Sequence, residues 1–259
     1  MTFLAGILAR KREEVAARRA AEPERELEAR ARGAAAPRPF EEALSLRGGP
    51  TRIIAEVKRA SPSAGAIDAG LDAPAQARRY AAAGAAAISV LTDGPGFGGS
   101  LADLAAVRAA VDTPLLRKDF VVDRYQLLEA RAAGADAALL IVAALPDDAL
   151  RALLDACAAL GLAALVEVHD GAEADRALAA GARIVGVNNR DLHSFAVDLA
   201  TSERILPRLP GGVRGVAESG VRSTEDALRL RRAGAANLLV GEALVRAADP
   251  GALIREMSE

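Results

Sequence analysis

From about residue 52 onward, short apolar runs alternate with longer amphipathic stretches. The runs are nearly continuous in Val, Ile and Leu, as expected of parallel strands that are covered on both faces. The stretches between them are rich in Ala and Arg, and several end at a glycine, which closes a helix with positive φ at no steric cost. The pattern predicts eight β-α units, with strands at about 52–58, 86–92, 114–118, 137–142, 163–168, 183–188, 213–218 and 236–241.

Eight β-α units in roughly 200 residues predict an α/β fold, a single (β/α)8 TIM barrel. A doubly wound open sheet is the alternative, and it favours a glycine-rich turn after the first strand. The first run here continues instead into Glu-Val-Lys and Ser-Pro-Ser. Residues 1–48 are helical and charged, with breaks at Pro23, Pro37 and Pro39. We expect residues 1–48 to form an N-terminal helical extension packed on a catalytic barrel of residues 49–259.

Charged and polar residues end five of the apolar runs. A buried ionised group costs several kcal/mol unless it is paired or hydrogen-bonded. Five such endings therefore indicate one polar site, because the carboxyl ends of barrel strands meet at the face that carries the active site. The endings are Glu56-Val57-Lys58, Arg117-Lys118-Asp119, Glu167, Asn188-Asn189-Arg190 and Glu218-Ser219-Gly220.

The first of these endings favour acid–base chemistry. Glu56 and Lys58 are two residues apart on a strand, so both point to one face, as a working pair or as an ion pair that caps the core. Lys118 follows two leucines, and an apolar setting with other cations nearby predicts a lowered pKa suited to proton donation. A solvated strand end is the alternative for Lys118. Glu167 stands between two valines and requires a cation, for which Lys118 and Lys58 are the candidates.

The later endings favour anion binding. Asn188 supplies a donor and an acceptor, and Arg190 offers a planar fork suited to a carboxylate, although Asn-Asn-Arg is also an ordinary polar loop. Gly220 and Gly241 would let backbone N–H groups approach a phosphate, and Ser219 would add a hydroxyl. Two histidines follow these endings and are expected to be loop residues: His169 and His193.

Composition narrows the classes of function. Among 259 residues, Lys and Arg number 33 against 35 Asp and Glu, with 3% aromatic residues, which argues against a nucleic-acid partner. A single Cys157 excludes an intramolecular disulfide and fits a reducing compartment, and two histidines make a His/Cys metal site unexpected. The N-terminal apolar run is short and precedes its basic residues, and no run approaches the ~20 residues of a membrane span. A cytoplasmic location without membrane association is expected.

Taken in order, the polar segments resemble those of indole-3-glycerol phosphate synthase. The resemblance covers about residues 40–245, and the helical extension is similar as well. The segments are Glu56-Val57-Lys58-Arg59-Ala60-Ser61-Pro62-Ser63, Ser89-Val90-Leu91-Thr92-Asp93, Phe97-Gly98-Gly99-Ser100, Leu116-Arg117-Lys118-Asp119-Phe120, Leu165-Val166-Glu167-Val168-His169, Gly186-Val187-Asn188-Asn189-Arg190-Asp191-Leu192, Glu218-Ser219-Gly220 and Leu239-Val240-Gly241-Glu242.

The resemblance implies a carboxy-lyase of tryptophan biosynthesis. In that reaction a ring closes on 1-(2-carboxyphenylamino)-1-deoxyribulose 5-phosphate, carbon dioxide and water leave, and indole-3-glycerol phosphate forms. No metal or organic cofactor is implied. Lys118 resembles the general acid of ring closure and Glu167 the acid–base group of the later steps, with Lys58 sharing proton delivery.

The resemblance also implies roles for the remaining site residues. Asn188 would hold a substrate hydroxyl or a catalytic side chain, and Glu56 and Arg190 would orient the lysines and the anionic substrate. Glu218 would bind the polar centre of the substrate, and Ser61 would line its anthranilate end. The phosphate would be held by Ser219, Gly220 and Gly241, and an apolar wall for the aromatic ring would be formed by Phe97, Phe120, Leu145 and Leu192.

One departure and three rival functions are part of the same prediction. Ala64 stands where the family often places a lysine, so a loop cation that closes over the substrate is missing here. The rivals are another phosphate-binding barrel such as a phosphoribosyl isomerase, a non-catalytic scaffold subunit, and a nucleic-acid module. The two strand-end lysines and three glutamates argue against both the phosphoribosyl isomerase and the scaffold subunit. Association with other tryptophan-pathway enzymes is a further hypothesis.

Overall fold

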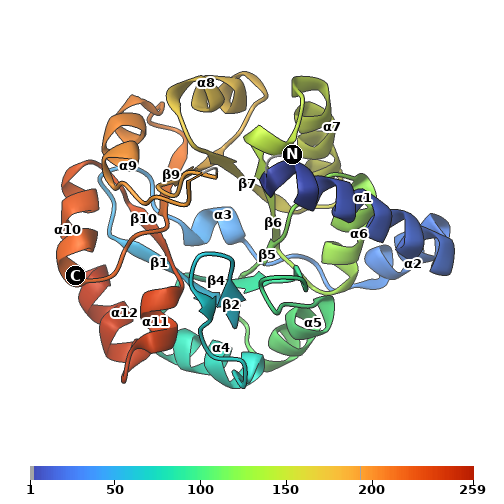
Figure 1. Cartoon of the computed structure of the whole chain (residues 1–259), viewed down its shortest axis with the longest axis horizontal. Coiled ribbons are helices and arrows are strands. Elements are labelled where there is room, and N and C mark those ends of the chain that lie inside the picture. The colour runs from blue at the N-terminus through green and yellow to red at the C-terminus, as the bar shows by residue number, and fades with distance from the viewer. Residues whose placement is uncertain (1–2, 193) are drawn as a thin grey trace.

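Eight parallel strands close into a barrel in the computed structural model, which describes residues 3–192 and 194–259 (Figure 1). The predicted TIM barrel is confirmed, and every predicted strand begins and ends within one residue of the observed one. The last strand pairs with the first and closes the ring. In chain order the strands are β1 (Arg52–Val57), β4 (Ala87–Leu91), β5 (Leu115–Lys118), β6 (Ala137–Ile141), β7 (Ala163–Val168), β8 (Ile184–Asn188), β9 (Arg214–Glu218) and β10 (Asn237–Val240).

Helices surround the ring of strands (Figure 1). Most begin at a Ser or Asp whose side chain accepts a backbone N–H of the first turn, as Asp170 does from Glu173. Glycines with positive φ follow several of them, including Gly84, Gly134 and Gly181. The helices are α4 (Ala73–Ala82), α5 (Leu101–Ala110), α6 (Arg124–Ala132), α7 (Asp147–Ala159), α8 (Gly171–Ala179), α9 (Ala200–Ile205), α10 (Thr224–Arg232), α11 (Glu242–Arg246) and α12 (Pro250–Ser258), with the 3-10 turns η1 (Val142–Ala144) and η2 (Leu206–Arg208).

One continuous hydrophobic core includes residues from every strand of the barrel. Its Val, Leu and Ile side chains lie almost wholly out of solvent, and each contributes about 1.5–3 kcal/mol by burial. This core makes the barrel rigid up to the carboxyl ends of its strands, where polar side chains replace the apolar ones.

Three helices precede the first strand: α1 (Phe3–Ala21), α2 (Glu24–Gly33) and α3 (Phe40–Ala43). Helix α2 packs against α6, and a small separate cluster of apolar residues joins α1, α2 and α6. Its buried members are Val15, Leu27, Ala31, Tyr125 and Leu128. We therefore propose that residues 1–48 are an extension of the barrel, since α1 and α2 bury apolar residues together with those of α6.

Candidate active site

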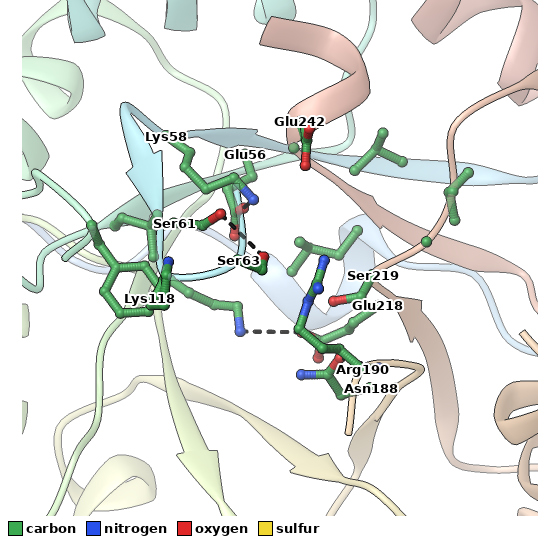
Figure 2. Close-up of a pocket in the computed structure, with 18 of the residues that line it drawn as sticks. Glu56, Lys58, Ser61, Ser63, Lys118, Asn188, Arg190, Glu218, Ser219 and Glu242 are labelled. Carbon is green, nitrogen blue, oxygen red and sulfur yellow. Dashed lines mark hydrogen bonds and ion pairs between the residues drawn. The ribbon is translucent and has the colours of Figure 1, made fainter. Parts of the chain in front are cut away.

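The carboxyl ends of the strands surround a cavity of about 540 Å³, within the usual size range of small-molecule sites (Figure 2). Side chains from most of the strands and from the loops after them line it, so residues far apart in the sequence meet there. Of the predicted site residues, those that line the cavity are Glu56, Lys58, Ser61, Phe97, Lys118, Phe120, Glu167, Asn188, Arg190, Leu192, Glu218, Ser219, Gly220 and Gly241.

Glu56 and Lys58 form the ion pair that their spacing on β1 predicts. Lys58 Nζ lies 2.8 Å from Glu56 Oε1, and both side chains are largely buried. Gly241, at the end of β10, leaves the space that this pair occupies: a Cβ there would lie 2.5 Å from Glu56 Oε1 and 3.0 Å from Lys58 Nζ. Gly241 therefore has a role that the sequence did not reveal, in accommodating the ion pair.

Lys118 lies between two carboxylates that line the cavity with it, and Figure 2 shows it beside one of them, Glu218. Its Nζ donates to Glu167 Oε2 at 2.8 Å and lies 3.2 Å from Glu218 Oε2. The expected lowering of the Lys118 pKa is wrong. Burial does disfavour the charged amine, but Glu167, Glu218 and Glu56 outweigh burial and raise the Lys118 pKa above its ordinary value. The sequence argument considered neighbouring cations, whereas the barrel surrounds this lysine with anions.

Glu167 and Glu218 share Lys118 but differ in charge state. Burial opposes ionisation of Glu167, but Lys118 and His169 outweigh it and lower the Glu167 pKa. Burial and the Glu167 carboxylate raise the pKa of Glu218, and Lys118 offsets this only in part. Glu167 is thus an ionised base, and Glu218 is the carboxyl that more readily keeps a proton. Of the two candidate partners for Glu167, Lys118 fills the role and Lys58 pairs with Glu56.

Glu218 reaches Lys118 because Gly186, on the neighbouring strand β8, leaves space for the Glu218 side chain. A Cβ at Gly186 would lie 2.0 Å from Glu218 Oε1, far inside van der Waals contact. Gly186 and Glu218 lie on the paired strands β8 and β9. This glycine was quoted in the sequence motif without a role, and its role is to leave room for the carboxylate.

His169 lies in the loop between β7 and α8, as expected, but its side chain makes contacts that the sequence did not reveal. Its imidazole is largely buried behind Glu167, with Nε2 3.4 Å from Glu167 Oε1 and Nδ1 3.0 Å from Glu173 Oε2. Burial favours the neutral ring, but the two carboxylates outweigh it and raise the His169 pKa to about 10. The strand period of two, which paired Glu56 with Lys58, also places His169 beside Glu167 and could have indicated this contact. His193, the other histidine, lies outside the described residues.

Of the two loops predicted to hold a phosphate, the loop after β9 has a tight backbone. Ser219 has φ 64° and Gly220 φ 84°, and a Cβ at Gly220 would lie 2.5 Å from Val197 Cγ1. Ser219 is a non-glycine residue in the left-handed region, a strained conformation that often marks functional loops. Asn189 holds this loop by donating from Nδ2 to the Ser219 carbonyl at 3.1 Å. Gly241 follows β10, the strand paired with β9, and is the residue directly before the short helix α11.

Asn188 and Arg190 lie at the end of β8, on the side of the cavity opposite Glu56 and Lys58 (Figure 2). Asn188 Oδ1 accepts the backbone N–H of Arg190 at 3.0 Å, which fixes the orientation of the amide. The Arg190 guanidinium donates to the Phe195 carbonyl at 3.0 Å. Both side chains are therefore held at the cavity wall before any ligand binds.

Three of the four residues predicted to form the apolar wall line the cavity. The rings of Phe97 and Phe120 lie 6.0 Å apart and tilted at 56°, and both line the cavity with Leu192. The prediction for Leu145 is wrong: it does not line the cavity but belongs to the core, and its carbonyl accepts from Arg176 of α8. The 3-10 turn η1 follows β6 and separates Leu145 from Ile141, the last cavity-lining residue of that strand. Other apolar side chains in the wall are Leu91, Leu139, Ile141 and Leu239.

A small hairpin after β1 carries the serines of Ser-Pro-Ser. It consists of β2 (Ala60–Ser61) and β3 (Gly65–Ala66), and Ser61 and Ser63 line the cavity from it (Figure 2). Ser61 Oγ accepts the backbone N–H of Ala64 at 3.2 Å, so the departure at Ala64 sits inside the hairpin turn. Strands of two residues are too short to produce a periodic pattern, which is why the sequence indicated only a turn here.

Helix α1 contributes to the same face of the barrel. Lys11 Nζ lies 2.5 Å from Asp93 Oδ1 and 3.0 Å from Asp119 Oδ1, and all three side chains are buried. Near the start of the helix, Phe3 lines the cavity and packs edge-on against Phe195, with ring centroids 5.0 Å apart. Sequence reasoning missed these contacts because pattern alone does not place an N-terminal helix on a particular face.

Within residues 3–192 and 194–259, no group of three or more His, Cys, Asp and Glu side chains has an arrangement that could hold a metal ion. In the same described part of the chain, no helix is both long and apolar enough to cross a membrane.

Comparison with known proteins agrees with this geometry. The family model described as indole-3-glycerol phosphate synthase matches residues 4–257. The chain is 53% identical over 256 residues to the indole-3-glycerol phosphate synthase of Mycobacterium ulcerans (strain Agy99), covering 99% of this chain and 93% of that protein. It is 52% identical over 230 residues to the protein of that name from Streptomyces griseus, covering 89% and 86%.

Solved structures show the fold alone. A 3-hexulose-6-phosphate synthase superposes with a TM-score of 0.60 at 22% identity, covering 80% of this chain and 98% of that one. KGPDC from Streptococcus mutans superposes with a TM-score of 0.63 at 14% identity, covering 81% and 96%. The fold is thus common to barrels of different function, whereas the sequence match extends over nearly the whole chain. The chain belongs to the indole-3-glycerol phosphate synthase family.

Proposed function

We propose that the cavity at the carboxyl ends of the strands carries out the family's reaction with Lys118 as the general acid and Glu167 as the proton acceptor. Family membership gives the activity itself: the chain is an indole-3-glycerol phosphate synthase, a carboxy-lyase of tryptophan biosynthesis, and its substrate is a small phosphorylated molecule. The assignment of residues to steps is the proposal.

The first step forms a carbon–carbon bond. The aromatic carbon that bears the carboxylate attacks the ketone carbon of 1-(2-carboxyphenylamino)-1-deoxyribulose 5-phosphate, and the ketone oxygen takes a proton from Lys118. The charged state of Lys118, held by Glu167 and Glu218, supports this role because a general acid must carry its proton when the substrate binds. Loss of carbon dioxide then returns the electron pair to the ring.

The second half of the reaction removes water. The new hydroxyl leaves with a proton, and the adjacent carbon loses a proton to complete the indole. Glu167 is ionised and largely buried, which suits it to accept this proton. Lys58, held by Glu56 at 2.8 Å, is the second cation available to the departing hydroxyl. Glu218, whose pKa is raised by burial and by Glu167, would hydrogen-bond to the polar centre of the substrate.

The ends of the substrate would bind at opposite walls. The phosphate would bind the backbone around Ser219, Gly220 and Gly241. The tight turn at Ser219 and Gly220 and the position of Gly241 directly before α11 support close approach of N–H groups. Asn188 would hold a substrate hydroxyl, and Arg190 would interact with an anionic group. The anthranilate ring would lie against Ser61 and the apolar wall, now without Leu145: Phe97, Phe120 and Leu192.

The observation that carries this proposal is Lys118 held between Glu167 and Glu218 inside the cavity. The test is Lys118→Ala, assayed by indole fluorescence after addition of the carboxyphenylamino-deoxyribulose phosphate. We expect kcat to fall by about 10²–10⁴-fold, the usual contribution of a positioned acid. Exposed Arg12→Ala is the control and should retain turnover. A Lys118→Ala enzyme with near-normal kcat would remove Lys118 from the chemistry, and an inactive wild-type preparation would count against the cavity proposal as a whole.

We further propose a cytoplasmic location, which the buried free thiol of Cys157 supports, and association with other tryptophan-pathway enzymes, which rests on the family resemblance. Fractionation of cells and co-elution of the tagged chain with those enzymes would test the two statements separately.

A further inference from the structure

Glu167 is held from two sides by different cations. Its Oε2 accepts from Lys118, and its Oε1 faces His169 Nε2 at 3.4 Å. His169 does not line the cavity, whereas Lys118 and Glu167 do. A ligand in the cavity can therefore reach Lys118 and Glu167 directly, while His169 can act only through Glu167.

Both ring nitrogens of His169 face carboxylate oxygens. Nε2 faces Glu167 Oε1, and Nδ1 lies 3.0 Å from Glu173 Oε2. A neutral imidazole has one N–H and one lone pair, so one nitrogen would then point its lone pair at an anion. The geometry therefore favours a ring that carries a proton on both nitrogens, and the raised pKa of His169 agrees with this.

Glu173 has a second function besides capping its helix. It is the third residue of α8, and its Oε2 accepts the backbone N–H of His169 at 2.8 Å. The same backward contact occurs at α6, where Gln126 accepts the N–H of Val122, and at α10, where Asp226 accepts that of Arg222. A neutral glutamine suffices at α6, so the capping contact does not require a charge. The charge of Glu173 is the feature that His169 uses.

We propose that His169, held by Glu173, is a positioning residue that keeps Glu167 ionised and oriented while Lys118 gives up its proton. The inference rests on the proposed roles of Lys118 and Glu167. When Lys118 transfers its proton to the substrate it becomes neutral, and Glu167 loses the cation that stabilises its buried charge. His169 remains charged because it takes no part in the transfer, so Glu167 stays a base for the later proton removal.

The surroundings of His169 fit this assignment. The ring lies near the carboxylates of Glu167, on β7, and Glu173, on α8. Beyond Glu167 lie Lys118 of β5 and Glu218 of β9, and Arg208 of η2 approaches the start of α8 at Gly171. The two carboxylates in direct contact set the charge of the ring, so removal of either one should be measurable.

The test compares kcat against pH for three variants. Glu173→Gln keeps an acceptor for the His169 N–H but removes the charge, so the His169 pKa falls toward its ordinary value of about 6.5. We expect its kcat to decrease as the pH rises through the neutral range, because the imidazolium loses its proton there. The wild-type plot of kcat against pH should lack this descending limb. His169→Gln keeps a neutral donor toward Glu167 and should lower kcat about 10- to 100-fold without that limb, with KM unchanged. The double variant should match His169→Gln alone.

Asp226→Asn is the matched control, since it removes a charge from the same capping contact on a different helix, α10. It should show no new limb in kcat. The inference is overturned if Glu173→Gln follows the wild-type profile, if His169→Gln keeps kcat within twofold, or if Asp226→Asn acquires the same limb.

A second measurement does not depend on turnover. The chain has two histidines, so the imidazole NMR signals of His169 are assigned by comparison with His193→Gln. His169 should remain protonated up to about pH 9 in the wild type and lose its proton at lower pH in Glu173→Gln. Titration near the ordinary value in the wild type would refute the inference even where His169→Gln does not fold. If the wild type shows no turnover while His169 stays protonated up to about pH 9 as expected, the result would instead count against the proposed function.

Discussion

Replacing Lys11 by methionine should destabilise the fold, because this lysine joins helix α1 to the active-site face of the barrel. Its Nζ lies 2.5 Å from Asp93 and 3.0 Å from Asp119, and its side chain is 2% exposed. Methionine matches the length of the lysine side chain but removes the charge. Two buried carboxylates then lose a cation, which is the situation in which breaking an ion pair is most costly.

The magnitude follows from the contacts that remain. Removing one partner of a buried pair costs about 3–5 kcal/mol when the other charge is left alone. Asp119 still accepts from Thr92 at 2.6 Å and from Arg117 at 2.9 Å, and Asp93 still accepts from Arg10 at 3.1 Å. We therefore expect the lower end, about 3 kcal/mol, which for a chain of this size lowers Tm by roughly 6–12 °C.

The loss should depend on pH in a defined way. Burial opposes ionisation of Asp119, but Arg117 and Lys11 outweigh it and hold its pKa well below the ordinary 3.8. A carboxyl with a lowered pKa in the folded state contributes stability that is present above its unfolded pKa and disappears as the pH falls. The pKa of Lys11 is raised despite its burial, so its own contribution is complete below about 10.5. The difference between variant and wild type should be constant from about pH 5 to 9 and shrink below about pH 4.

Urea unfolding followed by circular dichroism at several pH values measures this difference. Arg12→Met is the control, since it removes an exposed cation from the neighbouring position of the same helix and should change stability by less than about 0.5 kcal/mol. If Lys11→Met unfolds within about 0.5 kcal/mol of the wild type, or if the loss is the same at pH 3 as at pH 7, the ion-pair reasoning is wrong.

Two further predictions concern backbone positions of the site. Gly186→Ala places a Cβ 2.0 Å from Glu218 Oε1, so the carboxyl must move away from Lys118. We expect kcat to fall at least about tenfold and the fold to lose about 1–3 kcal/mol of stability. Gly212→Ala is the control, because a Cβ there meets no atom within 4 Å, and equal kinetics for the two variants would contradict the steric reasoning. Ser219→Gly removes the strain of a non-glycine residue with left-handed φ and should stabilise the fold by about 0.5 kcal/mol, measured by thermal unfolding. Loss of the hydroxyl should raise KM more than it lowers kcat. An unchanged KM would exclude Ser219 from phosphate binding.

The barrel was predictable from the sequence because its elements repeat. Each strand is a continuous apolar run, and glycines such as Gly134 and Gly181 mark the helix ends, so one period identifies all eight units. Residues that end a strand were predictable for the same reason, since the fold brings those ends together. This is why Glu56, Lys58 and Lys118 are found in one cavity as expected.

Contacts that depend on side-chain surroundings were not predictable in this way. The charge state of Lys118 depends on the three carboxylates around it, and a pattern along one strand does not show what the other strands contribute. Leu145 was misplaced because the turn η1 has no periodic signal. The buried contacts of His169 were missed although its spacing from Glu167 was visible, because its partner Glu173 comes from the following helix.

One signal in the sequence could have identified Lys11. The chain uses arginine for nearly all of its 33 basic residues and has only three lysines: Lys11, Lys58 and Lys118. All three have largely buried side chains and lie within 3.0 Å of a carboxylate oxygen. An ammonium group is compact and fits between closely spaced carboxylates, whereas a guanidinium is wide and planar. Lysine therefore suits these three sites, although Arg117 shows that a buried guanidinium is also accommodated, between Asp119 and Glu129.

The same argument connects the three lysines into one electrostatic system. Lys118 and Asp119 are neighbours on the chain, so the carboxylate that binds Lys11 is one peptide bond away from the residue proposed as the general acid. The Asp119 carboxylate also accepts the backbone N–H of Phe120, which fixes the loop that follows Lys118. A shift of α1 would thus move the backbone of Lys118 relative to Glu167. Because a displacement of about 1 Å at a reacting group can cost 10²-fold in rate, Lys11→Met should lower kcat as well as stability, with Lys118 itself unchanged.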